Sequence, residues 1–130
     1  MAPSALLIDH STISPELAVR IERVARDAGM DFLDAPVSGG PEGAAGATLS
    51  IMVGGDPEDF AAARPVLEAV GRTIVHVGPV GSGQTVKAAN QLIVATNIQA
   101  LAEAVVFLKA YDVDLESALE VLGGGLAGSA

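Results

Sequence analysis

The sequence contains no cysteine and no tryptophan, and only 3% of its 130 residues are aromatic. The absence of cysteine excludes a disulfide framework, a thiolate zinc site and a cysteine nucleophile. The two histidines, His10 and His76, lie far apart in the sequence, so a histidine metal cluster is not expected either. These absences leave the redox compartment open, and a cytoplasmic location is the default expectation.

Basic residues are scarce as well. Seven lysines and arginines stand against sixteen aspartates and glutamates, which gives a formal net charge of −9. No basic run is present, so neither a nucleic acid nor an anionic membrane surface is an expected partner. Half of the residues are hydrophobic and only 18% are charged, which argues against intrinsic disorder and predicts a substantial apolar core.

Long hydrophobic runs are also missing. Asp9 and His10 interrupt the first apolar run, which therefore does not have the pattern of a signal peptide. The longest uncharged helical stretch, residues 88–102, is shorter than the roughly 20 residues needed to cross a bilayer, and it contains asparagine and glutamine. We expect a buried helix in this stretch and no membrane partner.

Short apolar runs alternate with helical patterns along residues 1–80. A serine or aspartate followed by proline marks the start of each of two expected helices, at Ser14 and at Asp56. Strands separated by helices are typical of an α/β layer with a largely parallel sheet. The segment 36–46, rich in glycine and proline, is expected to be a loop. The expected strands are residues 5–8, 31–35, 49–53 and 73–77, and the expected helices end near residues 29 and 70.

The pattern changes after residue 80. No helix breaker occurs between Gln84 and about Tyr111, which predicts a helix of roughly 40 Å. Such a helix is too long for a crossover in a small sheet and indicates the spine of a separate helical domain. We therefore expect two partial domains, residues 1–80 and 81–130, with a further short helix over residues 115–122.

Two glycine-rich segments look like phosphate loops. Lys87 does not directly follow the second glycine of its segment, as a P-loop requires, so that motif is excluded. Residues 123–128 satisfy the letters G-x-G-x-x-G but follow an expected helix and not a strand. Glycine capping of the helix end is the better interpretation of residues 123–128.

Lys87 is the main candidate for proton chemistry. It lies near the start of the long expected helix, where a lysine can act as a proton donor. Asn90 and Asn97 fall on the same face of this otherwise apolar helix. The alternative is structural: the lysine extends to solvent and the asparagines bond to nearby backbone.

Two loops are candidates for ligand binding. Ser38, Gly39 and Gly40 could form a concave set of hydrogen-bond donors for a carboxylate or phosphate. Ser11 and Thr12 follow the carboxyl end of the first expected strand, where open α/β sheets place their ligands. Each loop also has a purely structural alternative, as an ordinary turn or as the lead into a helix cap.

Three motifs occur in a fixed order: DHSTISP at 9–15, DAPVSGG at 34–40 and GSGQTVKAAN at 81–90. Together they resemble the β-hydroxyacid dehydrogenase family, over residues 6–129. The resemblance implies the C-terminal part of a Rossmann-type nucleotide-binding domain, followed by the long first helix of an all-α domain like that of 6-phosphogluconate dehydrogenase. The lysine-to-asparagine spacing differs from that of 6-phosphogluconate dehydrogenases themselves, and imine reductases of the same fold lack this lysine.

The resemblance also implies an activity. Segments 48–55 and 84–98 look closest to enzymes that reduce 2-hydroxy-3-oxopropionate (tartronate semialdehyde) to glycerate, with NAD or NADP as cofactor and a small carboxylate as substrate. A 3-hydroxyisobutyrate dehydrogenase or a related short 3-hydroxyacid dehydrogenase is the alternative within the family, and a homo-oligomer is implied for the full-length form. A non-catalytic small-acid binding or oligomerisation segment is an alternative of another class. By resemblance, Lys87 is the general acid; Ser38, Gly39, Gly40 and Asn90 bind substrate; and Ser11 and Thr12 lie by the nicotinamide.

Two parts of the family pattern do not occur in these 130 residues. They are the N-terminal strand with its G-x-G-x-x-G pyrophosphate loop, and the later helices of the second domain. We therefore expect the sequence to be a fragment of a longer enzyme.

We predict that the 130-residue chain binds NADH or NADPH poorly and shows no measurable turnover, because the loop that grips the pyrophosphate does not occur in it. Isothermal titration calorimetry with each cofactor measures this directly. Stoichiometric binding would contradict the prediction.

Overall fold

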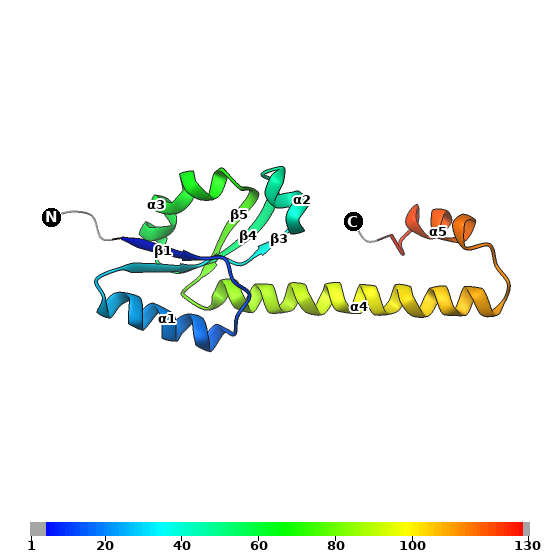
Figure 1. The fold of residues 1–130 in the computed structure, drawn as a ribbon, viewed down its shortest axis with the longest axis horizontal. Helices are drawn as coiled ribbons and strands as arrows, with labels where there is room; N and C mark the ends of the chain where they lie inside the picture. Colours follow the sequence, from blue (N-terminus) through cyan, green and yellow to red (C-terminus); the bar gives the residue numbers. More distant parts are fainter. Residues whose placement is uncertain (1–4, 129–130) are drawn as a thin grey trace. The chain divides into compact units, whose positions relative to one another are not determined.

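The computed structural model describes residues 5–128. The chain divides into two compact units, Met1–Ala89 and Asn90–Ala130. A long helix, α4, begins in the first unit and continues into the second (Figure 1). In chain order the elements are β1 (Leu6–Asp9), α1 (Pro15–Asp27), β2 (Asp31–Asp34), β3 (Val37–Ser38), α2 (Gly40–Ala45), β4 (Leu49–Gly54), α3 (Pro57–Glu68), β5 (Gly71–Gly78), α4 (Ser82–Ala110) and α5 (Leu115–Gly123).

The sheet of the first unit is mixed, where the sequence had predicted a largely parallel one. β1 pairs with β2, and β4 with β5, in parallel, whereas β2 and β3 both run antiparallel to β4. The reason lies in segment 36–46, which was expected to be a loop but contains β3 and α2. A six-residue helix is too short for the crossover that a parallel pair needs, so the chain returns beside β3 in the antiparallel sense.

β2 and β3 act as one extended segment that pairs with two different neighbours. Its first half pairs with β1, from Leu6↔Asp31 to Asp9↔Asp34. Its second half pairs with β4 in one unbroken register, from Asp34↔Gly54 to Ser38↔Ser50. Pro36 interrupts the strand because it has no amide hydrogen, yet its carbonyl still accepts from the amide of Met52 at 3.0 Å.

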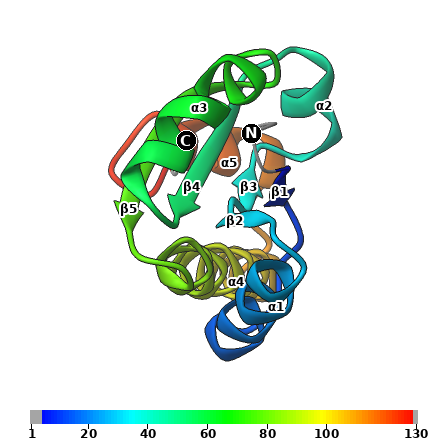
Figure 2. The same cartoon turned by 90° about the vertical axis from the view of Figure 1, so that its left-hand side faces the viewer.

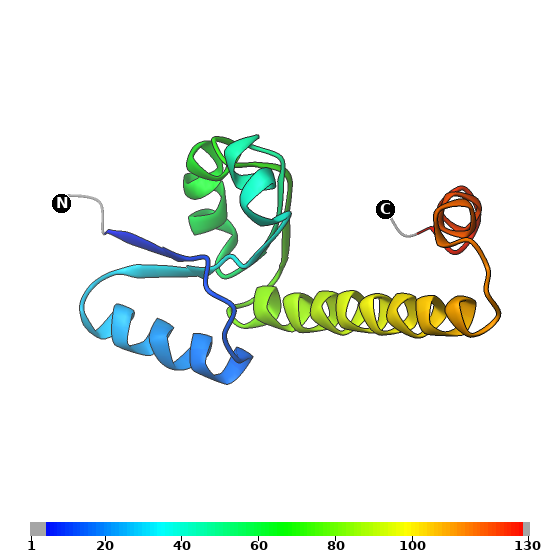
Figure 3. The same cartoon turned by 45° about the vertical axis from the view of Figure 1, so that its right-hand side comes forward.

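Helices cover both faces of this sheet. α1 lies on one face and α3 on the other (Figures 2 and 3). Alternation along β2 explains the two packing layers, because adjacent strand residues point to opposite faces. Phe32 packs with Ala18 and Ala25 of α1, whereas Leu33 belongs to the cluster that includes Leu67 of α3.

The helix boundaries follow the local signals in the sequence. The Ser14 hydroxyl accepts from the amide of Leu17 at 3.2 Å and caps α1, and Pro15 occupies its first turn. Asp56 caps α3 in the same way, through the amide of Glu58 at 2.8 Å. The expected role of the late glycines is confirmed, because Gly124 is the C-cap residue of α5.

The second unit contains the rest of α4, together with α5. The side-chain hydrogen bond from Ser117 at the start of α5 holds the pKa of Asp114 below its usual value.

The expectation of a buried helix over residues 88–102 is wrong for this chain: Leu92 is 69% exposed and Ile98 65%. A helical pattern in the sequence shows that residues are apolar, but it does not show whether another segment packs on them. No segment within residues 5–128 covers the side chains of Leu92 and Ile98. By length and composition α4 could also cross a membrane, a test that core helices of soluble proteins pass too.

We predict that Leu67→Ala destabilises the first unit by about 2–5 kcal/mol, because Leu67 is fully buried and its truncation leaves a cavity. Leu17→Ala is the matched control, since this helical leucine of the same unit is 39% exposed. Urea denaturation followed by circular dichroism measures both. Equal losses in the two variants would contradict the packing of α3 on the sheet.

Candidate active site

The centre of the candidate site is a fully buried carboxylate, Asp34, at the end of β2. Its Oδ1 accepts from the amide of Gly81 at 2.8 Å, and its Oδ2 accepts from the amide of Gln84 at 2.9 Å. Both donors belong to the amino-terminal end of α4. The carboxylate therefore satisfies otherwise unpaired amides and complements the positive end of that helix.

Two glycines allow α4 to approach the sheet this closely. A Cβ atom at Gly83 would collide with the carbonyl oxygen of Met52 and would lie 2.8 Å from Asp34 Oδ2. A Cβ atom at Gly54 would collide with Asp34 Oδ1 and would lie 2.9 Å from the amide nitrogen of Gly83. No side chain fits at either position, so the backbones of β2, β4 and α4 meet directly around the carboxylate.

The loop after β1 is fastened to the same helical turn. The side chain of Gln84, 1% exposed, accepts from the amide of Ile13 at 3.1 Å and donates to the carbonyl of Ser11 at 2.7 Å. The amide of Ser11 in turn donates to Asp9 Oδ1 at 2.9 Å. Ser11 and Thr12 thus present exposed side chains from a backbone that is held on both sides.

Lys87 lies one turn further along α4, on the face that also carries Gly83. The residue is only 8% exposed, so the aliphatic part of its side chain is buried. Among the described residues no buried side-chain nitrogen lacks a hydrogen-bond partner, so the unbonded Nζ of Lys87 reaches solvent, as the solvent-extended alternative requires. Within residues 5–128 the ion pairs are Arg26–Glu22 and Arg64–Glu68, so no carboxylate neutralises Lys87 there. An ammonium at the end of a buried aliphatic stem, with no carboxylate partner, is available to an anionic ligand or a developing oxyanion.

The motif Ser38-Gly39-Gly40 spans the end of β3 and the start of α2. Gly39 is the N-cap residue of α2 with φ +136°, and Gly40 has φ +63°. Residues that carry a side chain rarely adopt these φ values, and both glycines are exposed. The two glycines of this turn therefore lie at the surface, in a conformation that a side chain would disfavour.

Asn90 belongs to the second unit, where it is partly buried and its Nδ2 donates to Oε1 of Gln91 at 3.0 Å. The structure thus brings the Ser11–Thr12 loop and the first turns of α4 together through Gln84. Among the described residues, no hydrogen bond links Lys87 to Ser38, Gly39 or Gly40.

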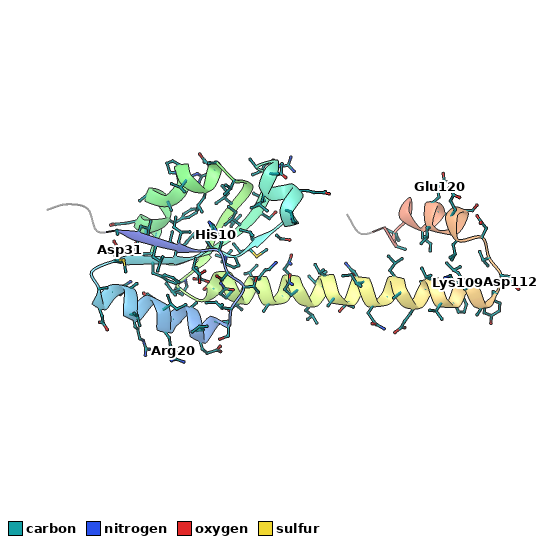
Figure 4. The ribbon with its side chains drawn as sticks, in the orientation of Figure 1. His10, Arg20, Asp31, Lys109, Asp112 and Glu120 are labelled. Carbon is teal, nitrogen blue, oxygen red and sulfur yellow. The ribbon has the colours of Figure 1, made fainter. Side chains whose placement is uncertain are left out.

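Both histidines have structural partners. His10, at the end of β1 (Figure 4), bonds through Nδ1 to the carbonyl of Ala35 at 2.7 Å. His76 bonds through Nε2 to the carbonyl of Gly55 at 2.8 Å and stacks on Phe60. Within the described part of the chain, no group of three or more histidine, aspartate or glutamate side chains could hold a metal.

Sequence reasoning missed two residues of the site, Asp34 and Gln84, although both lie inside the motifs. Asp34 ends β2 between Leu33 and Ala35, and all three residues are buried. A charged residue in such a run requires a partner, and this was the available signal. Gln84 is a polar side chain in the first turn of an apolar helix, a weaker signal that does not reveal its distant partners.

Comparison with known proteins identifies NAD-binding domain families in the chain. Residues 1–78 match the family model for the NAD binding domain of 6-phosphogluconate dehydrogenase. Residues 81–130 match the model for the NAD-binding region of NADP-dependent 3-hydroxyisobutyrate dehydrogenase. The chain belongs to the β-hydroxyacid dehydrogenase family, within this larger group of NAD-binding proteins, and the expected fold class and the family's NAD or NADP cofactor are confirmed.

Individual relatives agree with this assignment. The chain is 47% identical over 123 residues to 2-hydroxy-3-oxopropionate reductase of Escherichia coli, covering 95% of this chain and 42% of the relative. It is 49% identical over 104 residues to NAD-dependent L-serine dehydrogenase of Pseudomonas aeruginosa, covering 80% and 35%. The structure of Mycobacterium tuberculosis 3-hydroxyisobutyrate dehydrogenase with L-serine has a TM-score of 0.86 and 42% identity, covering 98% and 44%. The chain spans less than half the length of each.

We predict that Asp34→Asn lowers the stability of the first unit by about 1–3 kcal/mol, because one buried acceptor oxygen is replaced by an amide donor that faces a backbone amide. Asp56→Asn is the matched control: Asp56 also accepts from a helix amide but is exposed, and asparagine is an equally good cap. Thermal unfolding of both variants measures the difference. A wild-type melting temperature for Asp34→Asn would contradict the anchoring role of this carboxylate.

Proposed function

We propose that this chain carries the catalytic lysine and part of the substrate site of an NAD(P)-dependent enzyme that reduces 2-hydroxy-3-oxopropionate to glycerate. The observation that supports it best is the position of Lys87: its stem is buried, its ammonium has no carboxylate partner among the described residues, and it lies one turn beyond the anchored start of α4. The relative named for this reaction is 47% identical to the chain over 123 residues.

The proposed reaction assigns Lys87 as the general acid. When bound, the nicotinamide supplies the hydride that the carbonyl carbon accepts. The ammonium of Lys87 stabilises the negative charge that grows on the carbonyl oxygen and then gives that oxygen a proton. In the reverse direction the neutral amine takes the proton from the hydroxyl group.

The turn Ser38-Gly39-Gly40 is assigned to the substrate carboxylate. The turn contains two exposed glycines and a serine hydroxyl, and backbone amides and hydroxyls are the donors that a carboxylate requires. An acidic protein can bind an acid in this way because local donors outweigh net charge. Asn90 is assigned to substrate orientation on the family resemblance alone.

Ser11 and Thr12 are assigned to the nicotinamide end of the cofactor. This loop suits a nicotinamide, because the side chains of Ser11 and Thr12 are exposed at the carboxyl end of β1 and Gln84 holds the loop backbone in place. The residues that would grip the pyrophosphate are not among the described ones.

The remaining expectations belong to the same proposal. The domain boundary at residues 80 and 81 stays part of the proposal: one family model ends at residue 78 and the other begins at residue 81, whereas the compact units divide at Ala89 and Asn90. Homo-oligomer formation in the full-length form would cover the exposed apolar side chains of α4. A cytoplasmic location and the absence of nucleic acid and membrane partners stay predictions.

Two alternatives were open. The first alternative is oxidation of 3-hydroxyisobutyrate or of another short 3-hydroxy acid, which would use the same residues. A relative named as an L-serine dehydrogenase supports this alternative. The non-catalytic alternative treats Lys87 as a surface cation; the buried stem of Lys87 distinguishes it from the exposed Lys109.

The test is a hybrid in which residues 6–128 replace the matched segment of the Escherichia coli 2-hydroxy-3-oxopropionate reductase. We predict that the hybrid oxidises NADH or NADPH with 2-hydroxy-3-oxopropionate, and that Lys87→Ala lowers kcat by about 10²–10⁴-fold because the general acid is lost. Cofactor affinity is expected to be unchanged. Steady-state kinetics and fluorescence titration of the cofactor measure the two quantities.

Lys109→Ala is the matched control, since the second lysine of the chain is exposed near the end of α4. Full activity of the Lys87→Ala hybrid would overturn the catalytic assignment. Faster turnover of 3-hydroxyisobutyrate or L-serine than of glycerate would instead replace the proposed substrate.

A further inference from the structure

Gln84 stands out because its buried side chain serves a different part of the chain. It contacts the loop after β1, not its own helix, and both ends of its carboxamide are used. We propose that Gln84 is a positioning residue of the reaction, which holds the Ser11–Ile13 loop in a fixed place relative to the turn of α4 that carries Lys87. This inference rests on the proposed function.

The chemistry of the two hydrogen bonds calls for a carboxamide. Oε1 accepts from the amide of Ile13 and Nε2 donates to the carbonyl of Ser11, so the side chain must offer an acceptor and a donor together. The carboxamide of asparagine or glutamine offers both on one carbon atom, within a single planar group. A carboxylate would accept only and would face the Ser11 carbonyl with a negative charge.

The backbone of Gln84 is fixed as firmly as its side chain. Its amide donates to the buried Asp34 carboxylate, so one residue links β2, the start of α4 and the loop after β1. Gly83, Gln84 and Lys87 are the buried residues of α4. Because Lys87 follows within one helical turn, a shift of the loop relative to Gln84 is also a shift relative to the lysine.

A fixed position of the Ser11–Ile13 loop relative to Lys87 matters for hydride transfer more than for binding. Donor carbon, acceptor carbon and proton donor must be aligned together, and a misplacement of about 1 Å can cost roughly 100-fold in rate. The loop is assigned to the nicotinamide and Lys87 to the carbonyl oxygen. Gln84 would therefore set the distance between the two reacting ends without touching either.

The first experiment uses the 130-residue chain and does not need activity. Gln84→Met removes both hydrogen bonds at similar side-chain volume, whereas Gln84→Glu keeps the acceptor for Ile13. We expect the amide of Ile13 to exchange with deuterium about tenfold faster in Gln84→Met and near the wild-type rate in Gln84→Glu. Gln99→Met is the matched control, because Gln99 is exposed on the same helix and bonds to Glu103.

The second experiment uses the hybrid reductase described above. We expect Gln84→Met to lower kcat by about 10–100-fold while the KM for the oxo acid changes by less than about threefold. The primary isotope effect with the 4-deuterated cofactor should rise, because hydride transfer becomes slower than the other steps. Gln84→Glu should also lower kcat, since the Ser11 carbonyl loses its donor.

The outcomes separate the two proposals. If the Ile13 amide exchanges with deuterium at the wild-type rate in Gln84→Met, Gln84 does not hold the loop in place. A hybrid with normal kcat in Gln84→Met, beside faster loop exchange, overturns the positioning role and leaves the proposed function standing. A hybrid that is inactive with Gln84 in place overturns the proposed function, and the positioning role with it. An equal loss of kcat and rise of KM, with a lower melting temperature, assigns Gln84 a merely structural role.

Discussion

The buried carboxylate of Asp34 is the interaction on which this arrangement depends. It is fully buried, it lies at the end of β2, and both of its oxygens are bonded to amides at the start of α4. A charge in this position is tolerated only because the helix end supplies aligned donors. The same contact decides where α4 begins against the sheet, and hence where Gln84 and Lys87 lie.

Much of the fold could be predicted because its signals are local. The caps at Ser14 and Asp56 were visible in the sequence, since each bonds within its own first turn. The direction of β4 could not be predicted, because it depends on pairing between residues such as Val37 and Ile51, which no local pattern reports. The prediction that residues 88–102 are buried was wrong for the same reason: the sequence of an apolar helix does not reveal whether another segment covers it.

The candidate site was predictable only in part. Lys87, Ser38 and their neighbours came from motifs that match a known family, and the low exposure of Lys87 is consistent with that assignment. The role of Gln84 was out of reach, because its partners Ser11 and Ile13 lie more than 70 positions away. Residues that hold other residues in place are recognised by their partners, and the partners become visible only in the folded chain.

The long separation between Gln84 and its loop has a consequence for how the protein is made. β1 and α1 can form early on the ribosome, but the Ser11–Ile13 loop lacks its fixing bonds until residue 84 has emerged and docked on Asp34. Closure of so long a loop is slow compared with helix formation. The order of synthesis therefore makes this loop one of the last parts of the first unit to acquire its final geometry, after the sheet that supports it.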